Sequence, residues 1–288
     1  MVTGQSQNRR MKTAAVQMIS RPEWPANREA AARLVAQAAD AGARLVALPE
    51  YFCLLGRRDT DKLALAEAPG HGPIQDFLAE TALRHGVWLV GGTLPVHAEV
   101  PVNTEVPGRV LNRCAVYGPD GRAAGHYDKV HLFAFDNGRE SYDEGRTLCA
   151  GGQPVALDLP ATAHTPALRI GLSVCYDLRF PELYRALMAP PCDLLLVPAA
   201  FTHTTGQAHW EVLLRARAIE NQCYVLAPAQ GGLHENGRRT WGHSLLIDPW
   251  GQVVAVLPEG EGVVMGELDF ARIAQVRQQL PALAHRRL

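Results

Sequence analysis

Several features that would assign this chain to a common class are missing from its sequence. No apolar segment near the start precedes a small-residue cleavage site, and no later apolar run reaches the roughly 18 residues that span a bilayer. The 28 basic and 29 acidic residues nearly cancel, without any block of like charge. We therefore expect a cytoplasmic protein whose partner is a small molecule, and neither nucleic acid nor a membrane.

Motifs for metals, disulfides and nucleotides are also missing. The six cysteines are scattered without a C-x-x-C pair, and the 11 histidines form no H-E-x-x-H motif. None of the glycine-containing stretches matches G-x-G-x-x-G or G-x-x-x-x-G-K-[ST]. The sequence therefore predicts no metal site and no nucleotide cofactor, and most of its cysteines are expected to be reduced and buried.

Short apolar runs, each of strand length and ending in Gly, Pro or a polar residue, recur along the chain. Helical patterns separate several of them, at residues 27–41, 73–85, 181–188 and 209–222, whereas the part after Cys223 has no helical pattern. This alternation predicts an α/β layered fold with antiparallel hairpins near the end. Turn sequences at 119–122 and 248–251 fall inside hairpins, so we expect a mobile tail at 1–10 and a single domain at 11–288.

Cys175 ends the apolar run in "GLSVCYDLRF", and a helix with Pro181 in its first turn follows. Free cysteine is among the most buried residue types, so Cys175 taken alone is a core residue. At a strand-to-helix junction, however, backbone N–H groups can hold an oxyanion and lower a thiol pKa. The polar residues after Cys175 favour this second interpretation.

Two charged residues occupy comparable places. Glu50 follows an apolar strand and a proline in "RLVALPEYF", and Lys129 lies among apolar and aromatic neighbours in "GHYDKVHLF". Glu50 could simply be solvated in a loop, and Lys129 could form a structural salt bridge with Asp128 or Glu140.

A cysteine peptidase would need a distant histidine as its base, because no papain-like or caspase-like sequence surrounds Cys175. Four histidines remain open as that base, although each taken alone is more typical of a structural histidine. They are His131, His203, His209 and His243.

Taken together, "LPEYF", "YDKVHLF" and "VCYDLRFPELYR", followed by "GHSLLIDPWG", resemble the nitrilase or carbon–nitrogen hydrolase superfamily over about residues 12–288. Three separated motifs in the expected order are far more specific than any one of them. The resemblance implies a single-domain α-β-β-α sandwich. It also implies homodimers that stack through the helices around the cysteine segment, and no cofactor.

The resemblance also assigns roles to residues. It implies that Cys175 is the nucleophile, Glu50 the general base and Lys129 the cation that faces the tetrahedral intermediate. A supporting glutamate in the family follows the lysine motif, where Glu144 in "SYDEGRTLCAGG" matches best and Glu140 lies nearby.

Substrate contacts follow from the same resemblance. Tyr176 is expected to offer its backbone N–H to the oxyanion, and Arg179 to bind a substrate carboxylate. Phe201 and Thr205 match substrate-contacting positions of relatives. Gln207 stands where relatives commonly have proline, which predicts a looser loop.

The stretch from residue 200 to 251 looks closest to the deaminated glutathione amidase branch of the superfamily. The resemblance thus implies a cysteine amidase that hydrolyses deaminated glutathione to 2-oxoglutarate and cysteinylglycine, a metabolite-repair reaction. Two alternatives stay open: an ω-amidase that acts on α-ketoglutaramate, and a non-catalytic scaffold with the same fold.

Overall fold

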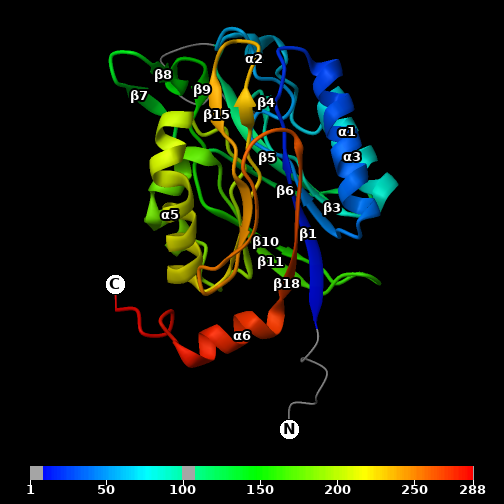
Figure 1. Cartoon of the computed structure of the whole chain (residues 1–288). Helices are drawn as coiled ribbons and strands as arrows, with labels where there is room; N and C mark the ends of the chain where they lie inside the picture. Colours follow the sequence, from blue (N-terminus) through cyan, green and yellow to red (C-terminus); the bar gives the residue numbers. More distant parts are fainter. Residues whose placement is uncertain (1–8, 99–107, 288) are drawn as a thin grey trace.

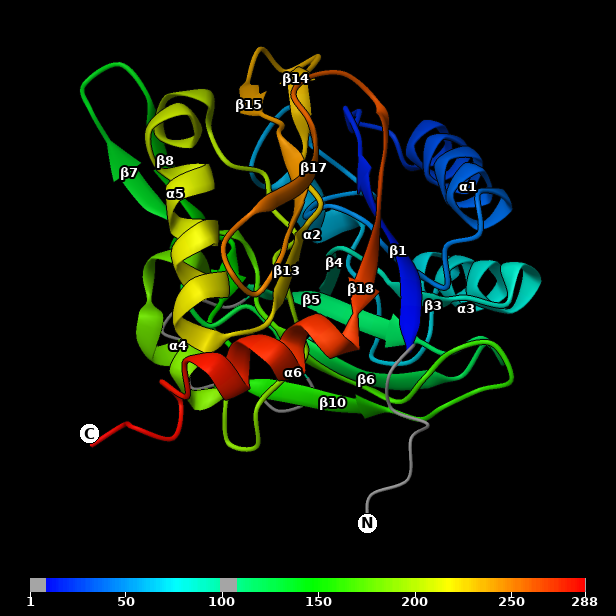
Figure 2. The same cartoon turned by 60° about the horizontal axis from the view of Figure 1, so that its bottom comes forward.

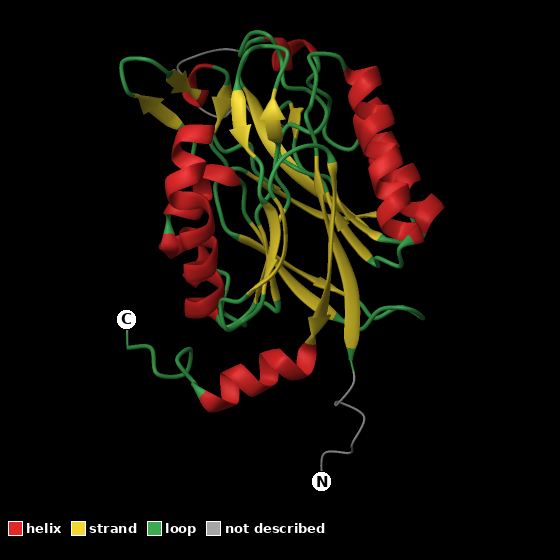
Figure 3. Ribbon diagram, viewed as in Figure 1, coloured by secondary structure: helices red, strands yellow, loops and turns green. Residues whose placement is uncertain are grey.

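Two β-sheets lie face to face between two layers of helices in the computed structural model, which describes residues 9–98 and 108–287 (Figure 1, Figure 3). Helices α1 (Trp24–Asp40) and α3 (Pro73–His85) cover one sheet. Helices α4 (Pro181–Ala186) and α5 (His203–Asn221) cover the other. The predicted α-β-β-α sandwich is therefore confirmed.

The first sheet has eight strands. Its main path runs β18-β1-β2-β3-β5-β4, while β6 and β9 also pair with β5. The bounds are β1 (Arg10–Gln17), β2 (Leu45–Ala47), β3 (Trp88–Val90), β4 (Leu94–Val96), β5 (Val110–Tyr117), β6 (Ala123–Asp128), β9 (Leu148–Cys149) and β18 (Gly262–Asp269). Side chains alternate along β1, so that Ala14 and Val16 pack towards the α1–α3 layer and Met11 and Ala15 towards the second sheet.

The second sheet has six strands in the order β10-β11-β12-β13-β16-β17. They are β10 (Val155–Leu159), β11 (Leu168–Leu172), β12 (Leu194–Leu196), β13 (Tyr224–Ala227), β16 (Ser244–Ile247) and β17 (Val253–Leu257). Strand β12 lies between two parallel neighbours, as β2 does in the first sheet. Each is followed by a proline, Pro49 or Pro198. The hydrogen bond from the Ala200 backbone nitrogen to Glu50 shows that these two strand ends meet at the same end of the sandwich.

Smaller elements lie beyond these strand ends. Two hairpins, short helix α2 and two 3₁₀ turns make up this group: β7 (Ala134–Asp136) with β8 (Ser141–Asp143), β14 (Gly231–Leu233) with β15 (Arg239–Trp241), α2 (Asp61–Ala64), η1 (Glu144–Arg146) and η2 (Cys175–Arg179). In Figure 1, β7, β8, β15 and α2 gather at the upper end of the sandwich.

The chain after Cys223 contains a helix that the sequence pattern does not reveal. The expectation of strands alone is wrong there, because α6 (Phe270–Gln279) begins where the Asp269 side chain accepts hydrogen bonds from the first turn. Only Ile273 and Val276 of this helix are buried, so its apolar face is too narrow for a clear pattern. Figure 2 shows α6 crossing the end of the second sheet.

Some of the other predicted boundaries agree with the structure, and the start of one helix does not. The turns at 119–122 and 248–251 join β5 to β6 and β16 to β17, as expected. Helix α5 begins at His203, six residues before the predicted start, since Thr202 caps it. Most of the predicted tail, residues 1–8, lies outside the described residues, and pairing of β1 starts at Arg10. No helix in the described ranges is long and apolar enough to cross a membrane.

Candidate active site

Two strand ends and one 3₁₀ turn bring the predicted charged residues together. Glu50 follows β2, Lys129 follows β6, and Glu144 opens η1. The Lys129 ammonium lies 2.9 Å from Oε1 of Glu50 and 2.8 Å from Oε2 of Glu144, and its side chain is 0% exposed. A lysine is therefore held between two carboxylates in the interior, where such a charge needs close partners.

Both carboxylate oxygens of Glu50 have fixed partners. Oε1 also accepts a hydrogen bond of 3.0 Å from Nδ2 of Asn112, and Oε2 accepts one of 2.9 Å from the Ala200 backbone nitrogen. Burial raises the pKa of Glu50 above its usual value of 4.5, and the charge of Lys129 offsets only part of this effect. Glu50 is thus a fixed carboxylate with more than ordinary proton affinity.

Glu144 has the opposite electrostatic balance. It accepts hydrogen bonds of 2.7 Å from the Tyr51 hydroxyl and 2.7 Å from the Phe133 backbone nitrogen. Burial would raise the pKa of Glu144, but the charge of Lys129 and these hydrogen bonds lower it below its usual value. Glu140 instead accepts a hydrogen bond from the Thr204 hydroxyl. The structure therefore brings Glu144, and not Glu140, to Lys129.

Burial by itself would lower the pKa of Lys129, but the charges of Glu144 and Glu50 raise it well above its usual value. Lys129 is consequently a permanent cation. Of the partners considered for it from the sequence, Asp128 pairs with Arg113 at 2.8 Å instead.

Cys175 is the first residue of η2, and its φ angle of 50° lies in the left-handed region, which is unfavourable for a residue with a side chain. Its backbone nitrogen donates a hydrogen bond of 2.9 Å to the Pro198 carbonyl. Burial and the negative charge of Glu50 raise the thiol pKa well above its usual value, against the opposing charge of Lys129. The resting group is therefore a thiol, close enough to Glu50 for each to shift the other's pKa.

A small pocket opens over this thiol, which is 8% exposed. All five residues predicted around the nucleophile and substrate line it, together with three that the sequence did not single out: Cys175, Tyr176, Arg179, Phe201 and Thr205, with Phe133, Ala200 and Thr202. The Arg179 guanidinium carbon lies 5.4 Å from the Phe201 ring centroid and 5.7 Å from that of Tyr176. Within the described residues, no carboxylate lies at ion-pair distance from Arg179, which leaves this cation available to a ligand.

The four histidines considered as a base lie elsewhere. Nδ1 of His131 is 2.7 Å from Oδ1 of Asp177. Nδ1 of His209 is 3.2 Å from Nη1 of Arg179. The rings of His203 and His243 pack against Trp241. None of them hydrogen-bonds to Cys175 in the part of the chain that the structure describes. The site therefore has the Glu/Lys/Cys arrangement and not a Cys/His pair.

The expectation of a loosened loop at Gln207 is wrong, because Gln207 is the fifth residue of α5 and its side chain is exposed. It lies along an outer groove rather than in the thiol pocket.

Three residues of the site were missed from the sequence. Asn112 donates a hydrogen bond to Glu50, and Tyr51 donates one to Glu144. The buried Asp177 carboxylate accepts hydrogen bonds from the Val174 backbone nitrogen and the Tyr127 hydroxyl, both 2.8 Å long. A signal existed for Asn112, since it is a polar residue inside the buried strand β5. Tyr51 and Asp177 directly neighbour motif residues and gave no separate signal.

Curated relatives match nearly the whole chain. A deaminated glutathione amidase from Synechocystis sp. is 44% identical over 275 residues, which cover 95% of this chain and 97% of that protein. The deaminated glutathione amidase of Homo sapiens is 39% identical, with 95% and 81% covered. Omega-amidase NIT2-A from Xenopus laevis is 36% identical, with 96% and 95% covered.

Solved structures share the fold. The crystal structure of the C. elegans NitFhit protein has a TM-score of 0.85 at 35% identity and covers 98% of this chain, which spans 66% of that longer chain. Saccharomyces cerevisiae Nit3, a member of branch 10 of the nitrilase superfamily, has a TM-score of 0.84 at 29% identity, with 99% and 100% covered. The sequence model described as carbon-nitrogen hydrolase matches residues 12–278. This chain therefore belongs to the carbon–nitrogen hydrolase family.

Proposed function

We propose that the protein is a cysteine-dependent amidase in which Cys175 is the nucleophile, Glu50 the general base and Lys129 the cation for the oxyanion. The observation that carries this proposal is the Lys129 ammonium, fixed by two buried carboxylates beside a thiol that opens into a pocket. A mutant of the amidase from Nesterenkonia sp. AN1, 26% identical with a TM-score of 0.74, was crystallised with acrylamide added to its active-site cysteine. That neighbour supports a reactive cysteine in this fold.

The reaction begins with a neutral thiol, because burial and Glu50 raise the pKa of Cys175. As its sulfur bonds to the amide carbon, the thiol proton passes to Glu50, whose own raised pKa favours accepting it. The oxyanion that forms is stabilised by Lys129 and the Tyr176 backbone N–H. The C–N bond then breaks, and the leaving amine takes the proton from Glu50.

The resulting thioester is hydrolysed by the same groups. Glu50 removes a proton from water, the hydroxide adds to the acyl carbon, and the sulfur leaves and regains the proton. Glu144 keeps Lys129 in place and charged through both halves, since its lowered pKa keeps it ionised at neutral pH. Each cycle thus consumes one amide and one water and restores the starting protonation states.

We propose deaminated glutathione as the substrate, because the 44% and 39% identical relatives carry the name of that activity. Arg179 supplies the cation for the carboxylate of the 2-oxoglutaryl group, while the Phe201 ring and the Thr205 hydroxyl form the neighbouring wall. The 36% identical omega-amidase favours α-ketoglutaramate as the second candidate, which shares this acyl group.

The test measures 2-oxoglutarate release from both substrates. We expect a higher kcat/KM for deaminated glutathione, and a clear preference for α-ketoglutaramate would make the enzyme an ω-amidase. Cys175→Ala should abolish release from both, whereas Cys192→Ala, a buried cysteine outside the pocket, should retain it. Activity that survives in Cys175→Ala would refute the mechanism. The scaffold alternative would be favoured if the wild type is inactive and its Cys175 is alkylated no faster than the other five cysteines.

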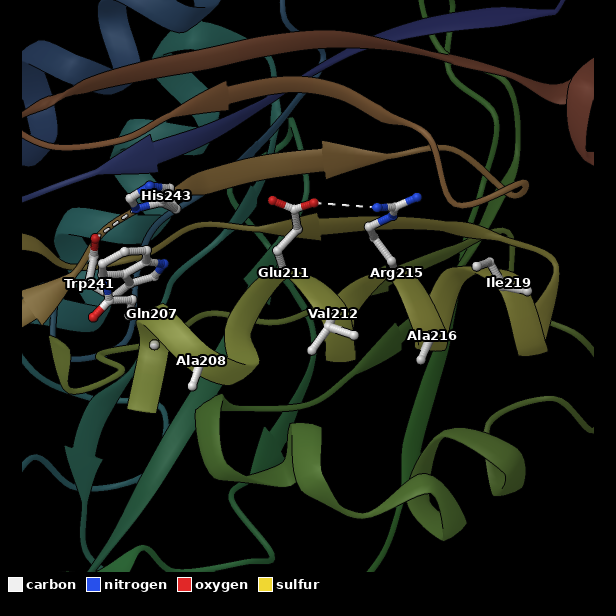
Figure 4. A pocket seen from close by; sticks show the side chains of 10 residues that line it. Gln207, Ala208, Glu211, Val212, Arg215, Ala216, Ile219, Trp241 and His243 are labelled. Atoms are coloured by element: carbon white, nitrogen blue, oxygen red, sulfur yellow. Dashed lines mark hydrogen bonds and ion pairs between the residues drawn. The ribbon is translucent and has the colours of Figure 1, made fainter. Parts of the chain in front are cut away.

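We also propose a homodimer formed through α5. Val212 and Ile219 on its outer side are 62% and 49% exposed, and they line a groove along the helix with Trp241 and His243 (Figure 4). The Glu211–Arg215 ion pair lies on the same groove and can meet its own copy across a twofold axis.

Sedimentation should give a dimer for the wild-type chain and a monomer for Val212→Arg/Ile219→Arg. Val254→Arg is the control, because Val254 is 47% exposed on β17 and lies outside the groove. A wild-type monomer, or a dimer that survives the double substitution, would contradict this interface.

A cytoplasmic location remains part of the proposal. All six cysteines are free, and the mechanism needs Cys175 as a thiol, which suits a reducing compartment.

A further inference from the structure

A second pocket lies beside the cluster of Glu50, Lys129 and Glu144, and its walls carry positive charge. Its walls come from the loop after Tyr51, from α2 and from the turn between β14 and β15, and they include Leu55, Lys62 and Arg238. The Lys62 ammonium lies 5.1 Å from the Tyr51 ring centroid. Because the Tyr51 hydroxyl holds Glu144, this pocket adjoins the groups around Lys129.

The second pocket shares walls with the thiol pocket. Tyr51 and Leu55 pack in one buried cluster with Ala200, which lines the thiol pocket. On another side, the Arg238 guanidinium lies 4.8 Å from the Tyr142 ring centroid, and that ring is 5.8 Å from the ring of Phe133, another residue of the thiol pocket. The two pockets are therefore neighbours in the fold.

Neither of the two cations forms an ion pair in the described part of the chain. Among the described residues, no carboxylate lies within ion-pair distance of Lys62 or Arg238, although Asp59 also lines the pocket. Arg58, in contrast, is neutralised by Asp61 at 3.2 Å. Burial lowers the pKa of Lys62, and the charges of Glu144 and Asp59, neither of them in an ion pair with it, offset only part of this effect. An anion of the ligand would relieve the remaining cost of burying this ammonium.

We propose that Lys62 and Arg238 form a subsite for a carboxylate on the leaving amine. The proposal rests on the proposed amidase function and refines its substrate class to amides of peptide-like amines. The cysteinylglycine part of deaminated glutathione is two residues long and spans about 7 Å when extended, which carries its carboxylate beyond the residues around Cys175. The ammonia released from α-ketoglutaramate has no such group. The subsite therefore separates the two candidate substrates.

The test compares both substrates in Lys62→Met and Arg238→Met. Removal of one charge-assisted hydrogen bond should raise KM for deaminated glutathione about ten-fold or more, while kcat/KM for α-ketoglutaramate changes less than about two-fold. Arg57→Met is the matched control, because Arg57 lies in the same segment, is largely exposed and is not among the pocket residues. The control should leave both substrates unchanged. In the wild type, deaminated glutathione with an amidated C-terminus should have a KM at least as high as the free acid has in either variant, and its KM should rise less in the variants than that of the free acid.

Each other result overturns the subsite. Equal losses for both substrates would mean that the cations act through Tyr51 and Glu144, and unchanged kinetics would mean that they bind no substrate. A wild type that hydrolyses neither substrate would refute the proposed function instead. In that case, calorimetric binding to Cys175→Ala decides the subsite. A preference for the free over the amidated C-terminus that becomes smaller when Lys62→Met is added supports the subsite, and no preference refutes it.

Discussion

Replacement of Lys129 by methionine isolates the energetic role of the buried cluster. Methionine preserves much of the side-chain volume but leaves Glu50 and Glu144 facing each other in the interior without the ammonium that is 2.9 and 2.8 Å away from them. Loss of one member of a buried, hydrogen-bonded ion pair costs about 3–5 kcal/mol of unfolding free energy. For a chain of this size, we expect the Tm to fall by roughly 10 °C.

The destabilisation should depend on pH in a defined direction. Without Lys129, the folded-state pKa values of both glutamates rise. A carboxyl group whose folded-state pKa is raised stabilises the fold at low pH and loses that contribution as pH rises from its usual value of 4.5 through the raised pKa. In the wild type, Glu144 has a lowered pKa and contributes stability above 4.5, which the variant also loses. The deficit of Lys129→Met should therefore be smallest near pH 5 and largest near pH 8.

Urea unfolding of wild type and variant at pH 5, 6.5 and 8 measures this deficit. Lys12→Met controls for the loss of a positive charge, because Lys12 is exposed and its ammonium forms one hydrogen bond within the described residues, to the Ala41 carbonyl at 3.5 Å. Adding Glu144→Gln to Lys129→Met should restore part of the stability at pH 8, since it removes one buried charge. A deficit below about 1 kcal/mol, or one equal at all three pH values, would refute the electrostatic reasoning.

Two further substitutions test how the fold positions the site. Asp177→Asn replaces a carboxylate that binds the Val174 backbone nitrogen and both the backbone nitrogen and Nδ1 of His131. We expect kcat to fall with little change in KM, and the free energy of unfolding to drop by about 1–3 kcal/mol. An unchanged kcat would contradict this role. Gly206→Ala would gain about 1 kcal/mol of helix propensity, but its methyl group would overlap Trp241, so thermal unfolding should show a net loss and not a gain in Tm.

The layered fold could be predicted because its strands are nearly continuous apolar runs, which parallel strands buried on both faces require. The positions of Glu50, Lys129 and Cys175 at the ends of such runs were equally visible. Helix α6 was not, since few of its residues are buried, and α5 started earlier than its amphipathic pattern because Thr202 caps it. The local sequence pattern thus identified the elements that are extensively buried. It missed the helix α6 and the start of α5, whose positions depend on a capping residue.

The sequence by itself determined the fold class, the family and the three motifs, because these depend on residue type and order along the chain. Only the tertiary structure decided that Glu144 rather than Glu140 reaches Lys129, that Asn112 fixes Glu50, and that Lys62 and Arg238 lie beside the thiol pocket. Such contacts join residues separated by tens to hundreds of positions, and their distances depend on how the two sheets pack. The stretch "GLSVCYDLRF" offers a thiol, and the packed sandwich places Glu50, Lys129 and a pocket around it.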